Sequence, residues 1–117
     1  SIPLKERNRI IKQRSRENNP LDPRYEREKY IARTYGLGWT DFLKMVEKQK
    51  SQCAICKDPI HPIGDEQNRA CHIDHCHTTG KVRGLLCSHC NRGLGGFKDR
   101  ALLCKLAAEY LEKESYD

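Results

Sequence analysis

Apolar side chains recur at helical spacing in the first half of the chain. The clearest stretch is residues 39–50, whose apolar positions share one face of a helix: Trp39, Phe42, Leu43, Met45 and Val46. This spacing predicts an amphipathic helix that contributes to the core. Residues 24–35 show a weaker pattern of the same period, which Gly36 and Gly38 end. Residues 1–19 are densely charged and predict a basic helix or a partly ordered arm.

From Cys53 onward the pattern changes to short turns and clustered polar residues. Residues 71–86 alternate in a way that predicts two short strands around a turn at residues 78–80. Ser88 is expected to cap a short helix that ends near Gly95, since serine is a preferred residue at helix starts and glycine at helix ends. The central region is therefore expected to be a hairpin followed by a helix.

A last helix is expected after Asp99, which is read as its capping residue. One of its faces is apolar and predicts contacts with the core or with a second subunit: Leu102, Leu103, Leu106, Ala107, Tyr110 and Leu111. Helices around one hairpin, in a chain of 117 residues, predict a small α+β fold. Because the chain is 32% charged and only 37% hydrophobic, its core must be thin and must need a disulfide, a metal or a partner.

The cysteine count and the absence of long apolar runs indicate the compartment. No stretch approaches the roughly 20 apolar residues of a membrane span, and the first ten residues lack the apolar core of a signal peptide. We therefore expect an intracellular protein without a membrane partner. In a reducing compartment its seven cysteines are metal ligands rather than disulfides, and an odd number cannot all pair.

Positive charge is concentrated in two segments. The chain has 22 Lys and Arg against 16 Asp and Glu, a net charge of +6. Residues 1–35 and residues 81–105 each carry a net charge of +5. Clustered positive charge favours a polyanion, because each neutralised phosphate releases condensed counterions. A nucleic acid is therefore a candidate partner, and the candidate contacts are Arg7, Arg9, Lys12, Arg14, Lys81, Arg83, Arg92 and Lys98.

Four cysteines form two Cys-x2-Cys pairs: Cys53 with Cys56, and Cys87 with Cys90. Each pair places two thiolates on one ion from a single turn, and two such turns complete a tetrahedral site. The pattern predicts structural zinc, with a redox dithiol or an iron–sulfur cluster as the alternatives. Loss of this metal should remove much of the folding free energy.

Hard-metal ligands and histidines remain after the four cysteines are used. Asp74 and Asn91 offer oxygen ligands for Mg²⁺ or Mn²⁺, and His75 is a candidate general base because of its imidazole side chain. Together they provide what phosphodiester hydrolysis requires. In a regular strand Asp74 and His75 point to opposite faces, so the strand must end there or carry a bulge if both serve one phosphate.

The segments 35–53, 53–56 and 72–91 together resemble the recombination endonuclease VII family of bacteriophages, within the HNH or ββα-metal (His-Me finger) nucleases. The resemblance implies a ββα-metal finger flanked by helices, DNA endonuclease activity, and the cytoplasm of a phage-infected or bacterial host. It also implies a single catalytic Mg²⁺ or Mn²⁺ held by Asp74 and Asn91, with His75 as the base.

The resemblance extends to two further residues. His77 is expected to help hold the scissile phosphate, and Arg83 to contact phosphate or to brace the hairpin. The chain departs from the family at Leu94, where the phage junction-resolving enzyme has a glutamate. We expect a basic arm over residues 1–35 and the nuclease domain over residues 36–117, as a monomer or homodimer.

Three alternatives follow from the same residues. The first is a zinc-stapled DNA-binding module without catalysis, and the second is a thiol redox protein that uses the two Cys-x2-Cys pairs. The third is a second zinc site, in which Cys71, His72 and Cys76 are the ligands. Otherwise Cys71, Cys76 and Cys104 are expected to be small buried residues, and His72 to be bonded within the hairpin.

Overall fold

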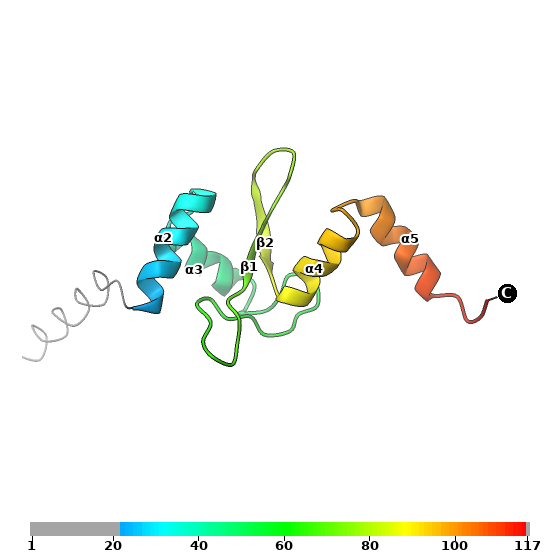
Figure 1. Cartoon of the computed structure of the whole chain (residues 1–117), viewed down its shortest axis with the longest axis horizontal. Helices are drawn as coiled ribbons and strands as arrows, with labels where there is room; N and C mark the ends of the chain where they lie inside the picture. Colours follow the sequence, from blue (N-terminus) through cyan, green and yellow to red (C-terminus); the bar gives the residue numbers. More distant parts are fainter. Residues whose placement is uncertain (1–21, 117) are drawn as a thin grey trace, which may run out of the picture.

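The computed structural model describes residues 22–116, which form a small α+β fold around one hairpin (Figure 1). The elements are helices α2 (Pro23–Tyr35) and α3 (Trp39–Lys48), strands β1 (His72–His75) and β2 (Val82–Leu86), and helices α4 (Ser88–Gly96) and α5 (Ala101–Leu111). In Figure 1, α2 and α3 lie to one side of the hairpin, and α4 and α5 lie to the other. The predicted fold class is confirmed.

Helix α2 begins and ends where local sequence signals place it. The Asp22 side chain accepts a hydrogen bond from Arg24 N at 2.8 Å, and Pro23 occupies the first turn, where its missing N–H costs nothing. The helix ends at Gly36, whose φ of 64° is a left-handed conformation that favours glycine. Its own side chains contribute little to the core, apart from the fully buried Ile31.

Helix α3 carries its apolar residues on one face, as predicted. Phe42 and Val46 are buried, and Trp39 and Met45 pack against them at the edge of the core, whereas Leu43 is 41% exposed. The core is thin, as the composition indicates. Its buried members come from α2, α3, the loop between α3 and β1, and the two strands: Ile31, Phe42, Val46, Cys53, Ile60, Cys71, Ile73, Leu85 and Leu86.

The hairpin pairs β1 antiparallel to β2, with His72 opposite Leu86 and Asp74 opposite Gly84. The register shifts between Asp74 and His75, which is the irregularity expected at this point. Beyond it the chain turns through residues 76–81, where Cys76 N donates to Lys81 O at 2.8 Å. The shift matters for function because it changes the direction in which the two successive side chains point.

Two polar side chains fasten the helices to the hairpin region. Gln49 pairs with the backbone of Leu85 in the manner of a neighbouring strand, since its Oε1 accepts from Leu85 N at 2.9 Å and its Nε2 donates to Leu85 O at 3.0 Å. Arg27 of α2 donates to Pro62 O at 3.0 Å and to Cys71 O at 2.6 Å. Side chains thus satisfy backbone groups that a two-stranded sheet leaves unpaired.

Three expectations about helix starts and faces need correction. The residue that caps α4 is Cys87, not Ser88, and its thiol accepts a hydrogen bond from Cys90 N. Helix α5 follows Arg100 without a side-chain cap, because the Asp99 carboxylate has other partners. The apolar face of α5 is no part of the core of residues 22–116, since Leu102, Leu106, Tyr110 and Leu111 are all exposed. The candidates Arg7, Arg9, Lys12 and Arg14, and the helix or arm expected over residues 1–19, lie outside the described residues.

Candidate functional site

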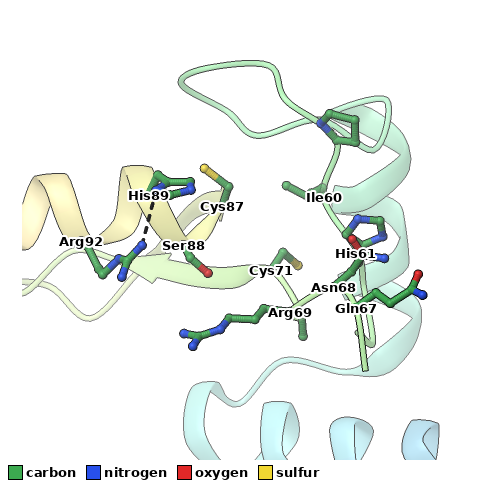
Figure 2. Close-up of a pocket in the computed structure, with 12 residues that line it drawn as sticks. Ile60, His61, Gln67, Asn68, Arg69, Cys71, Cys87, Ser88, His89 and Arg92 are labelled. Carbon is green, nitrogen blue, oxygen red and sulfur yellow. Dashed lines mark hydrogen bonds between the residues drawn. The ribbon is translucent and has the colours of Figure 1, made fainter. Parts of the chain in front are cut away.

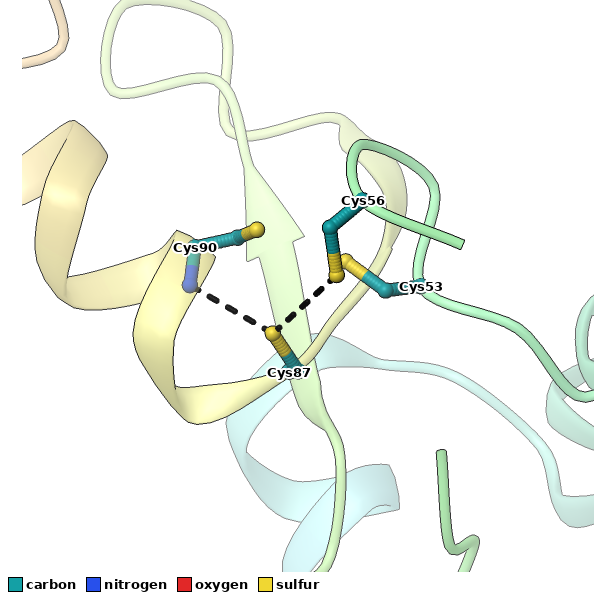
Figure 3. A group of neighbouring side chains, drawn as sticks. All are labelled: Cys53, Cys56, Cys87 and Cys90. Carbon is teal, nitrogen blue, oxygen red and sulfur yellow. Dashed lines mark hydrogen bonds between the residues drawn. The ribbon is translucent and has the colours of Figure 1, made fainter. Parts of the chain in front are cut away.

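The four predicted cysteine ligands converge on one point (Figure 3). Cys53 and Cys56 come from the loop after α3, while Cys87 and Cys90 come from the end of β2 and the first turn of α4. Their sulfur atoms all lie within 4.8 Å of one another, and Cys56 Sγ is 3.7 Å from Cys87 Sγ. A tetrahedral ion with Zn–S bonds of about 2.3 Å separates its sulfurs by about 3.8 Å. The cluster therefore fits a structural zinc.

The electrostatics of the cluster also favour a cation. Burial raises the pKa of Cys53, but hydrogen bonds from the backbone of Cys87, Cys56 and Ile55 outweigh it and lower that pKa to about 6. Burial and the neighbouring thiols raise the pKa of Cys90 to about 12. The cluster thus accepts one thiolate readily and resists further negative charge unless a positive ion compensates it.

The local backbone is shaped to present these thiols. Cys53 N donates to Asp58 O at 2.8 Å, and Lys57 N donates to Cys53 O at 3.1 Å, which closes a tight turn. Lys57 adopts a φ of 68° in this turn. On the other side, Cys87 caps α4, so the ligand pair Cys87 and Cys90 forms one helical turn. The cluster thereby joins the loop after α3 to the junction between β2 and α4.

A cavity of about 450 Å³ lies between the hairpin, α4 and the end of α2. Most of the residues predicted to do chemistry share its wall: Asp74, His75, His77, Asn91 and Lys98. Tyr35, His72, Ile73, Gly95 and Asp99 complete the lining. Residues from four separate segments are thus brought to one cavity, as the motif spacing requires.

The register shift explains how neighbours in sequence reach the same cavity. A regular strand would send Asp74 and His75 to opposite faces. Here the pairing slips between them, and both line the cavity. The expected irregularity is confirmed at the position where the chemistry requires it.

His75 is held between two other rings. Its imidazole stacks on that of His77 with centroids 5.0 Å apart and an interplanar angle of 3°, and its other neighbour is Tyr35 at 5.8 Å. His77 is more exposed, with 69% of its side chain accessible. Such packing limits the rotation of the His75 ring, and the residue is only partly buried.

Arg83 braces the hairpin, which is one of the two roles expected for it. Its Nε lies 2.7 Å from Asp74 Oδ2 and its Nη2 lies 3.0 Å from Asp74 Oδ1, so the pair is bidentate across the two strands. The guanidinium also reaches Asp99 Oδ2 at 3.0 Å. This ion pair and the coulombic attraction of both carboxylates raise the pKa of Arg83. The side chain of Asp74 is only 13% exposed as a result of this packing.

Asp99 is the site residue that the sequence pattern did not reveal. The turn between α4 and α5 places Lys98 and Asp99 in left-handed conformations, with φ values of 56° and 57°. This turn directs the Asp99 carboxylate to His77 Nε2 and Arg83 Nη2, each at 3.0 Å from Oδ2. In the sequence, an aspartate before an apolar helix indicates a helix cap. Only the three-dimensional structure identifies the contacts of Asp99 with His77 and Arg83.

Hard oxygen donors for Mg²⁺ or Mn²⁺ are present in the same cavity. The Asp74 carboxylate and the Asn91 side chain both line it, from β1 and α4 respectively. Carboxylate and amide oxygens are the ligands such ions prefer. The chemical types of these donors suit a divalent cation, and both Asp74 oxygens accept hydrogen bonds from Arg83 in this structure.

Several secondary expectations are settled by the geometry. His72 bonds outside the hairpin, since its Nε2 lies 3.3 Å from Ser88 Oγ, and burial together with the charges of Arg27, Arg69 and Arg92 lowers its pKa. Cys71 is buried as predicted, but Cys76 and Cys104 are only partly so. Within residues 22–116 the four clustered cysteines form the one group arranged for a metal, so a second zinc from Cys71, His72 and Cys76 is not formed there.

The remaining basic candidates lie around the cavity rather than in it. Lys81 is exposed in the hairpin turn, and Arg92 is exposed on α4 next to Asn91. Arg92 lines a second cavity on the other side of the helix start.

No helix within residues 22–116 is both long and apolar enough to cross a membrane.

The fold and site define a small α+β protein in which a hairpin and the following helix enclose oxygen and imidazole donors beside a four-cysteine cluster. The sequence pattern of the family described as recombination endonuclease VII matches residues 28–113. The chain belongs to this recombination endonuclease VII family, which confirms the resemblance noted in the sequence.

Two relatives come from mycobacterial viruses. The chain is 36% identical over 85 residues to the Gene 59 protein of Mycobacterium phage L5, which covers 72% of this chain and 49% of the relative. It is 34% identical over 87 residues to the Gene 59 protein of Mycobacterium phage D29, which covers 74% of this chain and 50% of the relative. The chain therefore spans about half the length of these curated relatives. No solved structure matches it significantly.

Proposed function

We propose that this protein is a metal-dependent DNA endonuclease of the HNH, or ββα-metal (His-Me finger), type. The observation that supports this most directly is the register shift in β1, because it lets Asp74 and His75 line one cavity with Asn91. A module that only binds DNA does not need a base and two hard oxygen donors in the same cavity. Family membership supports the same reading.

His75 acts as the general base in this proposal. It removes a proton from the attacking water, while its stacking on His77 and its tilted contact with Tyr35 restrict the orientation of the imidazole. Asp74 and Asn91 would hold Mg²⁺ or Mn²⁺, and that ion would supply charge stabilisation for the phosphate. The water oxygen bonds to phosphorus as the P–O3′ bond breaks, and the 3′ oxygen takes a proton from solvent. The products are a 5′-phosphate and a 3′-hydroxyl.

Arg83 supplies positive charge near the scissile phosphate, and His77 helps to hold that phosphate. Both contact Asp99, which therefore sets where the two side chains lie relative to the cavity. We assign Asp99 the role of a positioning residue, since it reaches the phosphate-binding groups and not the reacting atoms. The carboxylate fixes the His77 ring through Nε2 in the way that acidic residues commonly orient histidines.

The four cysteines bind a structural zinc that joins the loop after α3 to the start of α4. Because Asn91 directly follows Cys90, the position of one expected cation ligand depends on this cluster. We assign the nuclease domain to residues 36–117 and a DNA-contacting basic arm to residues 1–35. Lys81, Arg92 and Lys98 add phosphate contacts around the cavity.

A plasmid assay separates an endonuclease from a zinc-containing binding module. Supercoiled plasmid is incubated with zinc-loaded protein and Mg²⁺, Mn²⁺ or EDTA, and nicked and linear products are measured on a gel. We expect cleavage with either ion and none with EDTA, and we expect Asp74→Ala to lose the response to the ion. DNA binding without cleavage under every condition would establish the binding module instead. The same assay on linear, nicked and four-way DNA then reports the preferred structure and whether one strand or both are cut.

A further inference from the structure

A second cavity, of about 420 Å³, lies between the loop of residues 61–70 and the start of α4 (Figure 2). Its polar lining is basic or neutral: His61, Gln67, Asn68, Arg69, Ser88, His89 and Arg92. The remaining lining residues are Pro59, Ile60, Ala70, Cys71 and Cys87, so no aspartate or glutamate faces this space. The arrangement differs from the first cavity, where Asp74 and Asp99 both belong to the lining.

The loop side of this cavity is fixed by its own backbone. Asp65 Oδ1 accepts hydrogen bonds from Gln67 N and Asn68 N, both at 2.8 Å, so this carboxylate is used within the loop. Gly64 has a φ of 86°, and a Cβ at this position would lie 2.5 Å from Ala70 N, which only glycine avoids. Arg69 therefore projects from a preformed loop rather than from a freely moving one.

The helix side presents groups that suit an anion. Arg92 Nη2 lies 3.3 Å from His89 Nδ1, and the two side chains are neighbours on α4 (Figure 2). Within residues 22–116 neither Arg69 nor Arg92 forms an ion pair with a carboxylate. Two guanidinium groups that face one space without a protein counter-ion are suited to bind phosphate, with which arginine forms bidentate contacts.

The two cavities adjoin along α4. Asn91 lines the first and Arg92 the second, although they are consecutive residues. The His72 side chain lines the first cavity and bonds to Ser88, which lines the second, at 3.3 Å. One nucleic-acid strand that crosses α4 at its start would therefore place neighbouring phosphates in the two cavities.

We propose that Arg69 and Arg92 form a second phosphate site, which binds a backbone phosphate of the DNA strand beside the phosphate that is cleaved. The inference rests on the proposed function for its choice of ligand. It adds Arg69, which neither the charge distribution nor the family motif indicates. It also defines a path for the strand, from the hairpin cavity across α4 to the loop of residues 61–70.

A competing role for the two arginines is charge balance. Four thiolates around one Zn²⁺ carry a net charge of −2, and Cys87 also lines this cavity. If the arginines serve only to offset that charge, their removal should weaken zinc retention and leave DNA binding unchanged. The two roles therefore predict opposite results for the same substitutions.

The test measures binding of a labelled duplex by fluorescence anisotropy over a series of salt concentrations, in buffer without added Mg²⁺ or Mn²⁺ so that the duplex is not cleaved and the zinc is retained. The variants are Arg69→Gln, Arg92→Gln and the double variant that carries both. The control is Lys44→Ala/Lys105→Ala, which removes two exposed charges elsewhere. We expect the slope of log K against log salt to become less steep, by about 1 in magnitude, in the double variant. In the control pair it should be unchanged. Zinc content should remain at the wild-type level in all of them.

Three results would overturn the second phosphate site. One is an unchanged salt slope in the double variant, and another is loss of zinc from either single variant, which supports the charge-balancing role. The third combines two measurements: ³¹P NMR detects saturable binding of inorganic phosphate that the variants abolish, while the salt slope for DNA binding stays the same. The site would then serve a free anion. Failure of the nuclease proposal is distinguishable, because a protein that never cleaves DNA can still show the predicted change in slope.

Discussion

His77 Nε2 and Asp99 Oδ2 are 3.0 Å apart, although one residue follows β1 and the other lies in the turn before α5. The same oxygen atom accepts a hydrogen bond from Arg83 on β2. A single carboxylate thus joins the hairpin to the segment after α4 through an imidazole and a guanidinium group. The side chain of Asp99 is only 19% exposed, which strengthens both contacts relative to fully solvated ones.

Asp99→Asn should slow cleavage by about 10-fold to 100-fold, a range typical for groups that orient active-site side chains. The amide keeps the size of the carboxylate but loses its charge, so Arg83 and His77 are both held less firmly. The effect should fall on kcat more than on DNA affinity, and Asp99→Glu should restore part of the rate. Glu109→Gln, which removes an exposed carboxylate from α5, should have no effect. Equal losses in both variants would exclude a positioning role.

His75→Ala should lower the cleavage rate by about 10²-fold to 10⁴-fold, since a general base commonly contributes that much. DNA affinity and zinc content should stay close to those of the wild type, because His75 contacts neither. Single-turnover cleavage at neutral pH measures the rate, and circular dichroism checks the fold. Cleavage at the wild-type rate with an intact fold would refute the assignment of the base.

Cys87→Ser should abolish tight zinc binding and unfold the region between α3 and α4, because the residue supplies both a ligand and the cap of α4. Cys104→Ser is the matched control, since Cys104 lies on α5 outside the cluster. Metal analysis by mass spectrometry should find one zinc per chain in the wild type and in the control. Zinc retained at full stoichiometry in Cys87→Ser would contradict the ligand set.

Phe42→Ala should reduce the free energy of unfolding by about 3–5 kcal/mol, because it removes the largest fully buried side chain of the core. The adjacent Leu43→Ala, at a position 41% exposed, should cost much less. Urea denaturation of the zinc-loaded proteins compares the two. Similar losses in both variants would indicate that α3 packs with a different face toward the hairpin.

Cys76 should be alkylated unusually fast near neutral pH. Hydrogen bonds from the Thr79 side chain and from the backbone of Thr79 and Thr78 lower the pKa of its thiol to about 7, so about half is thiolate at that pH. The iodoacetamide rate in a Cys104→Ser background should rise to a plateau with a midpoint near pH 7. Thr79→Val should move this midpoint upward. A midpoint near that of free cysteine, about 8.5, would disprove the contacts in the turn.

The parts of the fold that the sequence predicts are those governed by local signals. Helical periodicity identifies α3, glycine at position 36 ends α2, and the spacing of cysteines indicates their cluster before any coordinates are known. The shift between Asp74 and His75 is also predictable, because two neighbours with one task cannot remain in a regular strand.

The parts that sequence patterns miss depend on contacts between distant segments. Asp99 has the sequence context of a helix cap, and only the left-handed turn at residues 98–99 directs it to Arg83 and His77 instead. The apolar face of α5 has the periodicity of a core helix, yet its leucines are exposed in the described chain. Periodicity indicates which residues share a face, but it does not indicate what covers that face.

The cysteine cluster has a consequence for how related proteins diverge. It connects Cys56 to Cys87 across 31 residues, so the hairpin turn and the loop of residues 61–70 both lie inside one closed loop of chain. The entropy of closing such a loop grows only with the logarithm of its length, and a doubling costs about 0.6 kcal/mol. Insertions at either place are therefore inexpensive for stability. Evolution can lengthen the segments that we propose to contact DNA, and so change which DNA is recognised, while the cysteine cluster and the residues around it remain the same.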